Sequence, residues 1–172
     1  MVPLVEFIFP FAAIKRNEYE TQYTFPGPGT YTVFSNDVAL LTNILNVPSS
    51  NERVLTIKTQ ITIPPSNPSH VPFYTNHMVE YTCVNQPWSF YPGAVDLDGD
   101  SLAYELIIPD DFDLSQAFGI NNPKDLPGYL FPDDNSFMNG AFLLDPESGL
   151  MEWNPVEEGI YYIGYAVSEY RD

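Results

Sequence analysis

Residues 55–70 read LTIKTQITIPPSNPSH, a stretch that contains both a strand and its end. From Leu55 to Ile63 apolar side chains alternate with polar ones. This pattern is typical of a strand that buries one face and exposes the other to solvent. Three prolines then follow within five residues, and they favour a stiff, extended connector. We therefore predict a domain boundary here. The predicted units are a first module at 1–63, a Pro-rich linker at 64–70 and a second module at 71–172.

Short apolar segments bounded by turn residues recur along the rest of the chain. Before the linker they are Val2–Ile14 and Tyr19–Phe34, the second split by a Pro-Gly-Pro-Gly turn, while Asn36–Val47 fits either a helix or a strand and loop. After the linker the expected strands are Phe73–Cys83, Trp88–Tyr91, Ser101–Ile108, Gly140–Leu144, Leu150–Trp153 and Ile160–Val167. This spacing predicts an all-β chain of two tandem immunoglobulin-like β-sandwich modules.

An internal echo supports two related modules. Residues 29–33 (GTYTV) and 159–163 (GIYYI) share the pattern G-x-Y-x-[VI]. A glycine turn that feeds a strand with an inward tyrosine resembles the tyrosine corner of immunoglobulin-like sandwiches. A match of five residues can also arise by chance.

The chain is strongly acidic, with 23 Asp and Glu against 6 Lys and Arg and a formal net charge of −17. Such a surface repels nucleic acid and anionic lipid, so neither is expected as a partner, and no apolar run is long enough to insert in a membrane. The charge would attract divalent cations, or would serve only to keep the chain soluble. The apolar start carries Glu6 and lacks a basic region, so we expect any export signal to lie outside this sequence.

The sharpest chemical signal is the run Asp96-Leu97-Asp98-Gly99-Asp100. Carboxylates at alternate positions, with a glycine that allows a tight bend, suit a hard cation that prefers oxygen ligands. We predict that Asp96, Asp98 and Asp100 bind calcium, with further ligands from Asp145 or from the acidic insertion at 109–139. The alternative is an Asp-Gly turn whose carboxylates accept hydrogen bonds from nearby backbone N–H groups.

Aromatic and acidic groups elsewhere have two interpretations each. Trp88, Phe90, Tyr91 and Trp153 could form a platform that stacks against sugar, or they could pack in the core. The acidic groups at 110–113 and 133–134 are better explained as a solvated face than as a catalytic carboxylate pair.

Zinc binding and catalysis have little support in the sequence. His70, His77 and Cys83 have an unfamiliar spacing for a zinc site, and the lone Cys83 is either a buried thiol or half of a bridge to another segment. The sequence contains no G-x-S-x-G elbow, no Gly-rich phosphate loop and no H-E-x-x-H motif. We therefore predict that the chain is not an enzyme.

Taken together, these motifs resemble a known kind of repeat region. Residues 85–106 (NQPWSFYPGAVDLDGDSLAYEL) resemble the opening of a cadherin-like module, and 144–153 with 159–171 resemble its second half. Residues 25–33 resemble the late Gly-x-Tyr strand of a PKD-type (polycystic kidney disease) immunoglobulin-like module. This order, with Pro-Gly-Tyr at 127–129 between the two halves, resembles large exported Bacteroidetes surface proteins of the gliding-motility-associated type.

The resemblance implies a module type, a cellular location and a function for this chain. It implies a PKD-like first module whose early strands would lie before Met1, and a cadherin-like second module. It also implies secretion or display on the cell surface, with other domains of the same protein, a cell-surface protein or a glycan as partners. We expect a non-catalytic structural or adhesive module, stiffened where calcium binds. The alternatives are a carbohydrate-binding module and an accessory domain of a secreted hydrolase.

Overall fold

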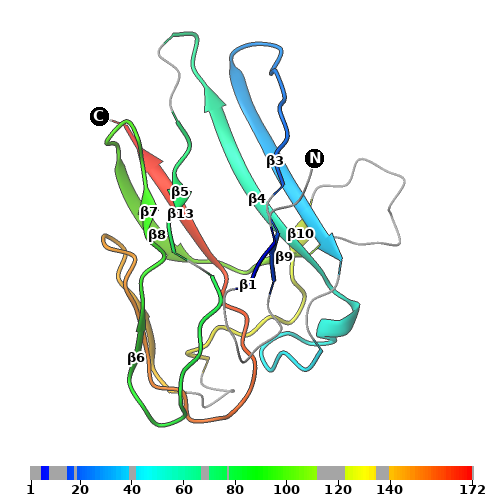
Figure 1. The fold of residues 1–172 in the computed structure, drawn as a ribbon, viewed down its shortest axis with the longest axis vertical. Helices are drawn as coiled ribbons and strands as arrows, with labels where there is room; N and C mark the ends of the chain where they lie inside the picture. The colour runs from blue at the N-terminus through cyan, green and yellow to red at the C-terminus, as the bar shows by residue number, and fades with distance from the viewer. Residues whose placement is uncertain are drawn as a thin grey trace.

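The computed structural model describes residues 5–7, 15–17, 19–38, 42–66, 70–76, 78–111, 123–134 and 140–171 (Figure 1). In these ranges all regular structure is β-strand, apart from the single 3-10 turn η1 (Ser50–Glu52). The predicted all-β class is therefore confirmed, whereas the division into two modules stays a prediction.

The strands of the described ranges pair antiparallel in small sheets. The largest sheet has the order β10 (Lys124–Asp125), β9 (Asp110–Asp111), β4 (Val54–Ile63) and β3 (Gly29–Val38). A second has the order β11 (Phe142–Leu144), β12 (Met151–Trp153) and β6 (Trp88–Phe90). The remaining pairs are β13 (Tyr165–Tyr170) with β8 (Ser101–Leu106), β5 (Phe73–Tyr74) with β7 (Ala94–Val95), and β1 (Val5–Phe7) with β2 (Lys15–Asn17).

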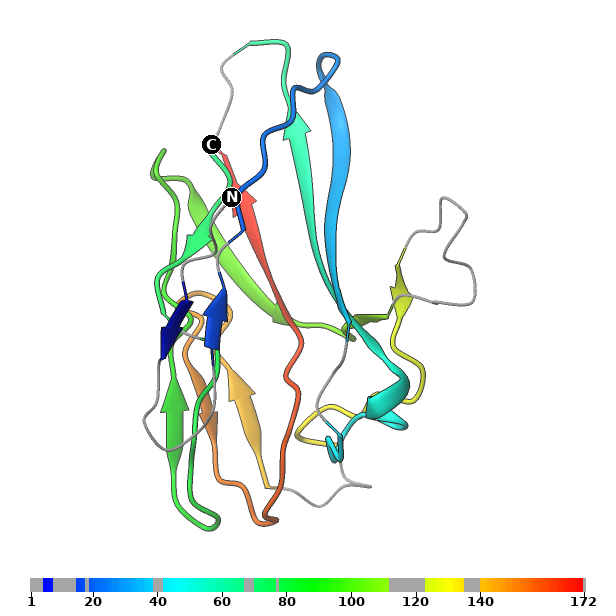
Figure 2. The same ribbon diagram turned by 45° about the vertical axis from the view of Figure 1, so that its right-hand side comes forward.

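β3 and β4 form a long two-stranded ribbon, which we call the β3–β4 ribbon. Their pairing is continuous from Gly29 opposite Ile63 to Val38 opposite Val54. β4 begins one residue before the predicted alternating stretch 55–63 and ends with it at Ile63, because each face of the ribbon takes every second side chain. In both views β4 lies between β3 and the final strand β13, so β3 is the outer strand (Figures 1 and 2).

One hydrophobic cluster lies under the sheet that contains β6, β11 and β12. Phe142, Met151 and Trp153 are buried there, and the partly buried side chains around them include Trp88, Leu106 and Tyr165. The Trp153 ring meets the rings of Trp88 and Tyr161 edge to face, with centroids 6.5 and 4.8 Å apart. The aromatic residues of this cluster therefore stabilise the fold mainly through burial and ring packing.

A second cluster draws on residues from both sides of the predicted linker. Ile44 and Val47 precede it, Leu126 and Tyr129 follow it, and all four are buried together. A parallel bridge between Ile44 and Ile160, and the pairing of β4 with β9, also cross from one side to the other. The two parts of the chain are thus held by core contacts as well as by residues 64–70.

Asn46 is the polar centre of this second cluster. Its side chain has no solvent exposure, and its Nδ2 donates to the carbonyl oxygens of Leu130 and Tyr162, at 3.0 and 2.7 Å. Its Oδ1 accepts from the backbone N–H of Tyr162 at 2.9 Å. The Tyr129 hydroxyl, whose pKa burial raises to about 12, also donates to the Tyr162 carbonyl. One amide therefore satisfies backbone groups of two segments that the sheets leave unpaired.

Tyr31 and Tyr161, the tyrosines of the two G-x-Y-x-[VI] segments, make equivalent hydrogen bonds. The Tyr31 hydroxyl donates to the carbonyl of Gly27 at 2.8 Å, and the Tyr161 hydroxyl donates to the carbonyl of Glu157 at 2.9 Å. In each case the acceptor lies four residues upstream of the ring. The sequence echo at 29–33 and 159–163 thus extends to a shared local geometry.

Several element bounds differ from the expected ones for tertiary reasons. The last strand is Tyr165–Tyr170 and not Ile160–Val167, because Ile160 and Tyr162 contact Ile44 and Asn46 instead of a sheet neighbour. The expected strand 73–83 shortens to Phe73–Tyr74, and the described residues after it are exposed and irregular. Asn36–Val47 is strand only to Val38 and forms turns from 42 onward.

Candidate functional site

The run 96–100 forms a turn between β7 and β8. Asp96 Oδ1 accepts hydrogen bonds from the backbone N–H groups of Asp98 and Asp100, at 2.8 and 3.0 Å. Gly99 has φ +81°, a conformation that other residues adopt at a cost, and a Cβ there would meet nothing within 4 Å. The local geometry is therefore that of an Asx turn, the structural alternative for this motif.

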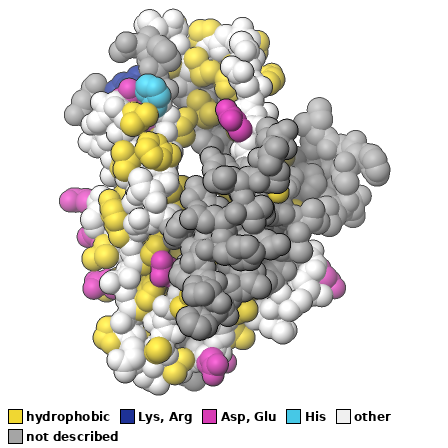
Figure 3. Space-filling model, in the orientation of Figure 1, with side chains coloured by type: hydrophobic (Ala, Val, Ile, Leu, Met, Phe, Trp, Pro, Cys, Tyr) yellow, Lys and Arg dark blue, Asp and Glu magenta, His cyan; other side chains and the backbone are white. Residues whose placement is uncertain are grey.

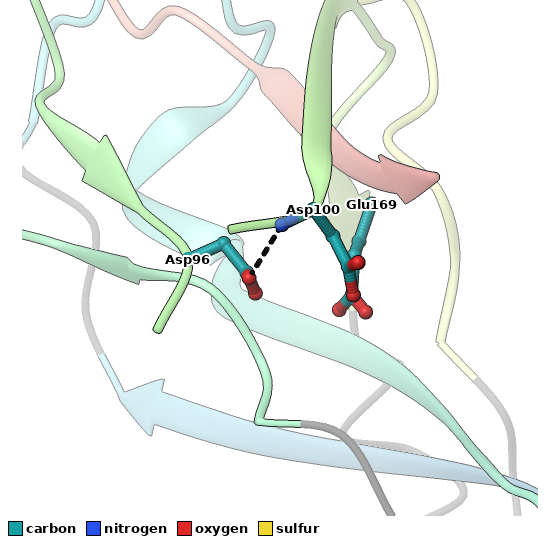
Figure 4. A group of neighbouring side chains, drawn as sticks. All are labelled: Asp96, Asp100 and Glu169. Atoms are coloured by element: carbon teal, nitrogen blue, oxygen red, sulfur yellow. Dashed lines mark hydrogen bonds between the residues drawn. The ribbon is translucent and has the colours of Figure 1, made fainter. Parts of the chain in front are cut away.

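The turn also takes part in an acidic cluster. One oxygen each from Asp96, Asp100 and Glu169 lie within 4.8 Å of one another (Figure 4). Glu169 belongs to β13, and it reaches the loop because β13 pairs with β8, where Glu169 stands opposite Leu102. Sequence reasoning missed Glu169, because only the register of two distant strands brings it next to Asp100.

Asp96 Oδ2 is the least satisfied atom of the cluster. Within the described part of the chain it is buried and has no hydrogen-bond partner. A buried carboxylate oxygen without a partner is costly, and a cation or a water molecule would remove that cost. Carboxylate oxygens are also the donors that calcium prefers, so the residues present fit a hard cation.

Asp98, the middle residue of the predicted trio, points to other partners. Its Oδ2 accepts from the His70 backbone N–H at 2.6 Å, its Oδ1 lies 3.1 Å from His70 Nδ1, and Arg171 Nη2 lies 3.7 Å from Oδ2. Figure 3 shows acidic, basic and histidine side chains together at the upper left of this face. The structure thus brings Asp96 and Asp100 together with Glu169, and it places Asp98 against His70.

Arg171 balances part of the negative charge at this place. Its Nε lies 3.2 Å from Asp100 Oδ2, in an ion pair whose side chains are 37% and 13% exposed. The loop therefore connects His70, the last residue of the predicted linker, to Arg171, which directly follows the final strand. A cation at the cluster would strengthen a junction that ion pairs and hydrogen bonds already form.

The other expected calcium ligands lie elsewhere or outside the described residues. Asp145 Oδ1 accepts from the backbone N–H groups of Glu147 and Ser148 and from the Ser148 hydroxyl. The Ser148 groups hold the pKa of this exposed carboxyl below its usual range. Asp145 thus closes its own turn, and residues 112–122 of the acidic insertion lie outside the described ranges.

Asp110 and Asp111 have structural partners and do not form a solvated face. Lys58 Nζ lies 2.7 Å from Asp110 Oδ2, and Arg53 Nη1 lies 3.0 Å from Asp111 Oδ2. Both basic residues belong to β4 or precede it directly. These ion pairs attach β9 to the largest sheet, a role that the sequence alone did not reveal.

Those remaining candidate residues that the structure describes do not assemble into a site. Trp153 is buried, Trp88 and Phe90 are half-buried, and of the four proposed sugar-stacking rings Tyr91 alone is exposed. Cys83 is exposed, so the expectation of a buried thiol is wrong. His77 lies outside the described residues, and His70 binds Asp98.

Comparison with family models, with curated proteins and with solved structures found no match. No helix in the described ranges is long and apolar enough to cross a membrane.

We predict that two substitutions at Asp96 differ in their effect on stability when a chelator is present. Asp96→Ala removes the acceptor of two backbone N–H groups and should lower the free energy of unfolding by about 2 kcal/mol. Asp96→Asn keeps Oδ1 and replaces the unpartnered Oδ2 with a donor beside two carboxylates, so it should change stability by less than about 0.5 kcal/mol or increase it. Urea unfolding measures both. Equal destabilisation by Asn and Ala would contradict this account of Oδ2.

Proposed function

We propose that the chain is a non-catalytic structural or adhesive module of a larger bacterial surface protein, with a loop that calcium stiffens. The observation that carries the proposal is the position of the acidic cluster. Its three carboxylates lie where the 96–100 turn, the last linker residue His70 and the last strand come together. A binding event there would stiffen the junction between neighbouring segments, which is the property that a spacer module needs.

The shared tyrosine geometry supports an immunoglobulin-like character for both parts of the chain. Tyr31 and Tyr161 each donate to a carbonyl four residues upstream. In immunoglobulin-like sandwiches a tyrosine of this kind fixes the corner before a late strand. The repeat of one geometry on each side of the linker agrees with tandem PKD-like and cadherin-like modules of the gliding-motility-associated type.

The positions of the charged and aromatic groups favour this function over the alternatives. Asp110, Asp111 and Asp145 are engaged in ion pairs or in a turn, which leaves them unsuited to proton transfer. Trp153 packs in the core, so it cannot stack on a sugar. The proposed location is extracellular, and the proposed partners are other domains of the same protein, a cell-surface protein or a glycan.

Calcium would bind through Asp96, Asp100 and Glu169. These residues supply three oxygen ligands out of the six to eight that calcium usually takes, so water would complete the shell. Arg171 would have to move aside from Asp100, because a cation and a guanidinium compete for the same carboxylate. We therefore expect weak binding, in the range of extracellular calcium modules.

We predict that calcium raises the melting temperature of the wild-type chain relative to chelator. A ligand at about 100 times its Kd stabilises the folded state by about 2.7 kcal/mol. Glu169→Gln should abolish most of this gain, because it removes one charge and one ligand from the cluster. The matched control is Glu105→Gln on β8, an exposed site with the same charge change that should leave the gain intact. If the melting temperature of the wild-type chain is the same with calcium and with chelator, the calcium part of the proposal is wrong.

The surface location needs its own test. Antibodies raised against this chain should label intact cells of the organism that encodes it, and treatment of those cells with an external protease should remove the label. An antibody against a cytoplasmic protein serves as the control for cell integrity. Labelling that appears only after permeabilisation would refute a surface module, whatever the calcium result.

A further inference from the structure

In its own sequence and pairing, the outer strand β3 lacks several of the features by which sheet edges avoid pairing with other chains. It runs for ten residues (29–38) in continuous register with β4, without a bulge. Its sequence, GTYTVFSNDV, contains no proline, lysine or arginine, and Asp37 near one end is its only charged residue. In the described ranges no strand pairs with its outer side. Long, flat and uncharged edges are the ones that accept another strand.

The same ribbon has an apolar face that the described part of the chain covers incompletely. Odd-numbered residues of the two strands share that face, because Tyr31 stands opposite Ile61 and Ser35 opposite Ile57. Val33 is 45% exposed and Ile57 is 65% exposed. A sheet that buries one face would normally cover residues of this kind.

Charge indicates what kind of strand would fit. In a chain of net charge −17, the paired residues 29–36 and 56–63 carry a single charged side chain, Lys58, which is bound to Asp110. The edge therefore offers no charge for a basic or an acidic partner to complement. A suitable strand is itself almost uncharged and rich in β-branched and aromatic residues, and β3, whose single charge lies near one end, is such a strand.

We propose that β3 pairs antiparallel with β3 of a second copy of this chain, independently of the function proposed above. Antiparallel pairing places the two copies of Asp37 at opposite ends, so like charges do not meet. A register centred on Thr32 or on Val33 joins the apolar faces of both ribbons on one side of a continuous sheet. A two-fold axis through the middle of the strand generates this arrangement, the commonest symmetry of protein dimers.

Sedimentation velocity on the full chain over a range of protein and salt concentrations tests the proposal. The interface contains no ion pair, whereas two copies of charge −17 repel each other. Salt should therefore strengthen the dimer, as the screening length falls from ~8 Å at physiological salt to ~3 Å at 1 M. A chain that stays monomeric throughout, or a dimer that salt weakens, would overturn the proposal.

A matched pair of substitutions locates the interface. Thr32 and Gln60 are both exposed and stand opposite each other on β3 and β4, so lysine at either position adds the same charge to the same face. Thr32→Lys places a charge at the paired edge and should weaken the dimer about tenfold. Gln60→Lys, one strand further in, should change it less than about twofold. Thermal unfolding checks that both variants fold. Equal effects of the two lysines would overturn the assignment to β3.

Discussion

The buried amide of Asn46 is the interaction on which the rest of the structure depends. Burying a polar side chain completely is costly unless its donors and acceptors are paired, and Asn46 pairs with backbone groups of Leu130 and Tyr162. The two partner segments lie far from it in sequence and belong to no sheet at those residues. Apolar packing of Ile44 and Leu126 around the amide lowers the local dielectric and strengthens these bonds. Parts of the chain before and after the linker are thereby fixed in one geometry.

Electrostatic contacts add a second layer of connections at the periphery. β9 is attached through Asp110 and Asp111 to Lys58 and Arg53, and the 96–100 turn is attached through Asp98 and Asp100 to His70 and Arg171. The side chains of Asp110 and Asp111 are 7% and 13% exposed, so breaking one of their pairs would leave a poorly solvated charge. The contacts of His70 are more exposed and weaker. The chain contains six lysines and arginines, and three of them, Arg53, Lys58 and Arg171, hold segments together in this way.

Sequence patterns predicted features whose cause is local. The alternation of 55–63 gave the bounds of β4 closely, and the Asp-Gly run formed a turn because its side chains reach backbone groups two and four residues away. The Gly-x-Tyr echo marked two tyrosines whose hydroxyls bind four residues upstream. Each of these outcomes depends on residues within a few positions of one another.

Features with a distant cause were not predictable in the same way. Glu169 joins the acidic cluster only through the β8–β13 register, and nothing near Asn46 in sequence indicates that residues 130 and 162 surround it. The Asp-Asp pair of β9 has the composition of an exposed loop, and it forms a strand because β4 offers both an open edge and two cations. Of the candidate site, the turn was therefore predictable and the third carboxylate was not.

Calorimetric unfolding of the wild-type chain beside Asn46→Leu tests the central claim most directly. If Asn46 unites the two sides of the linker, the wild type unfolds in one transition whose calorimetric and van't Hoff enthalpies agree. Asn46→Leu should then lose about 3 kcal/mol, because buried backbone groups of Leu130 and Tyr162 are left unpaired. Asn51→Leu, at an exposed position of η1, should lose less than about 0.5 kcal/mol. Two separate wild-type transitions, or equal losses in the two variants, would contradict the account.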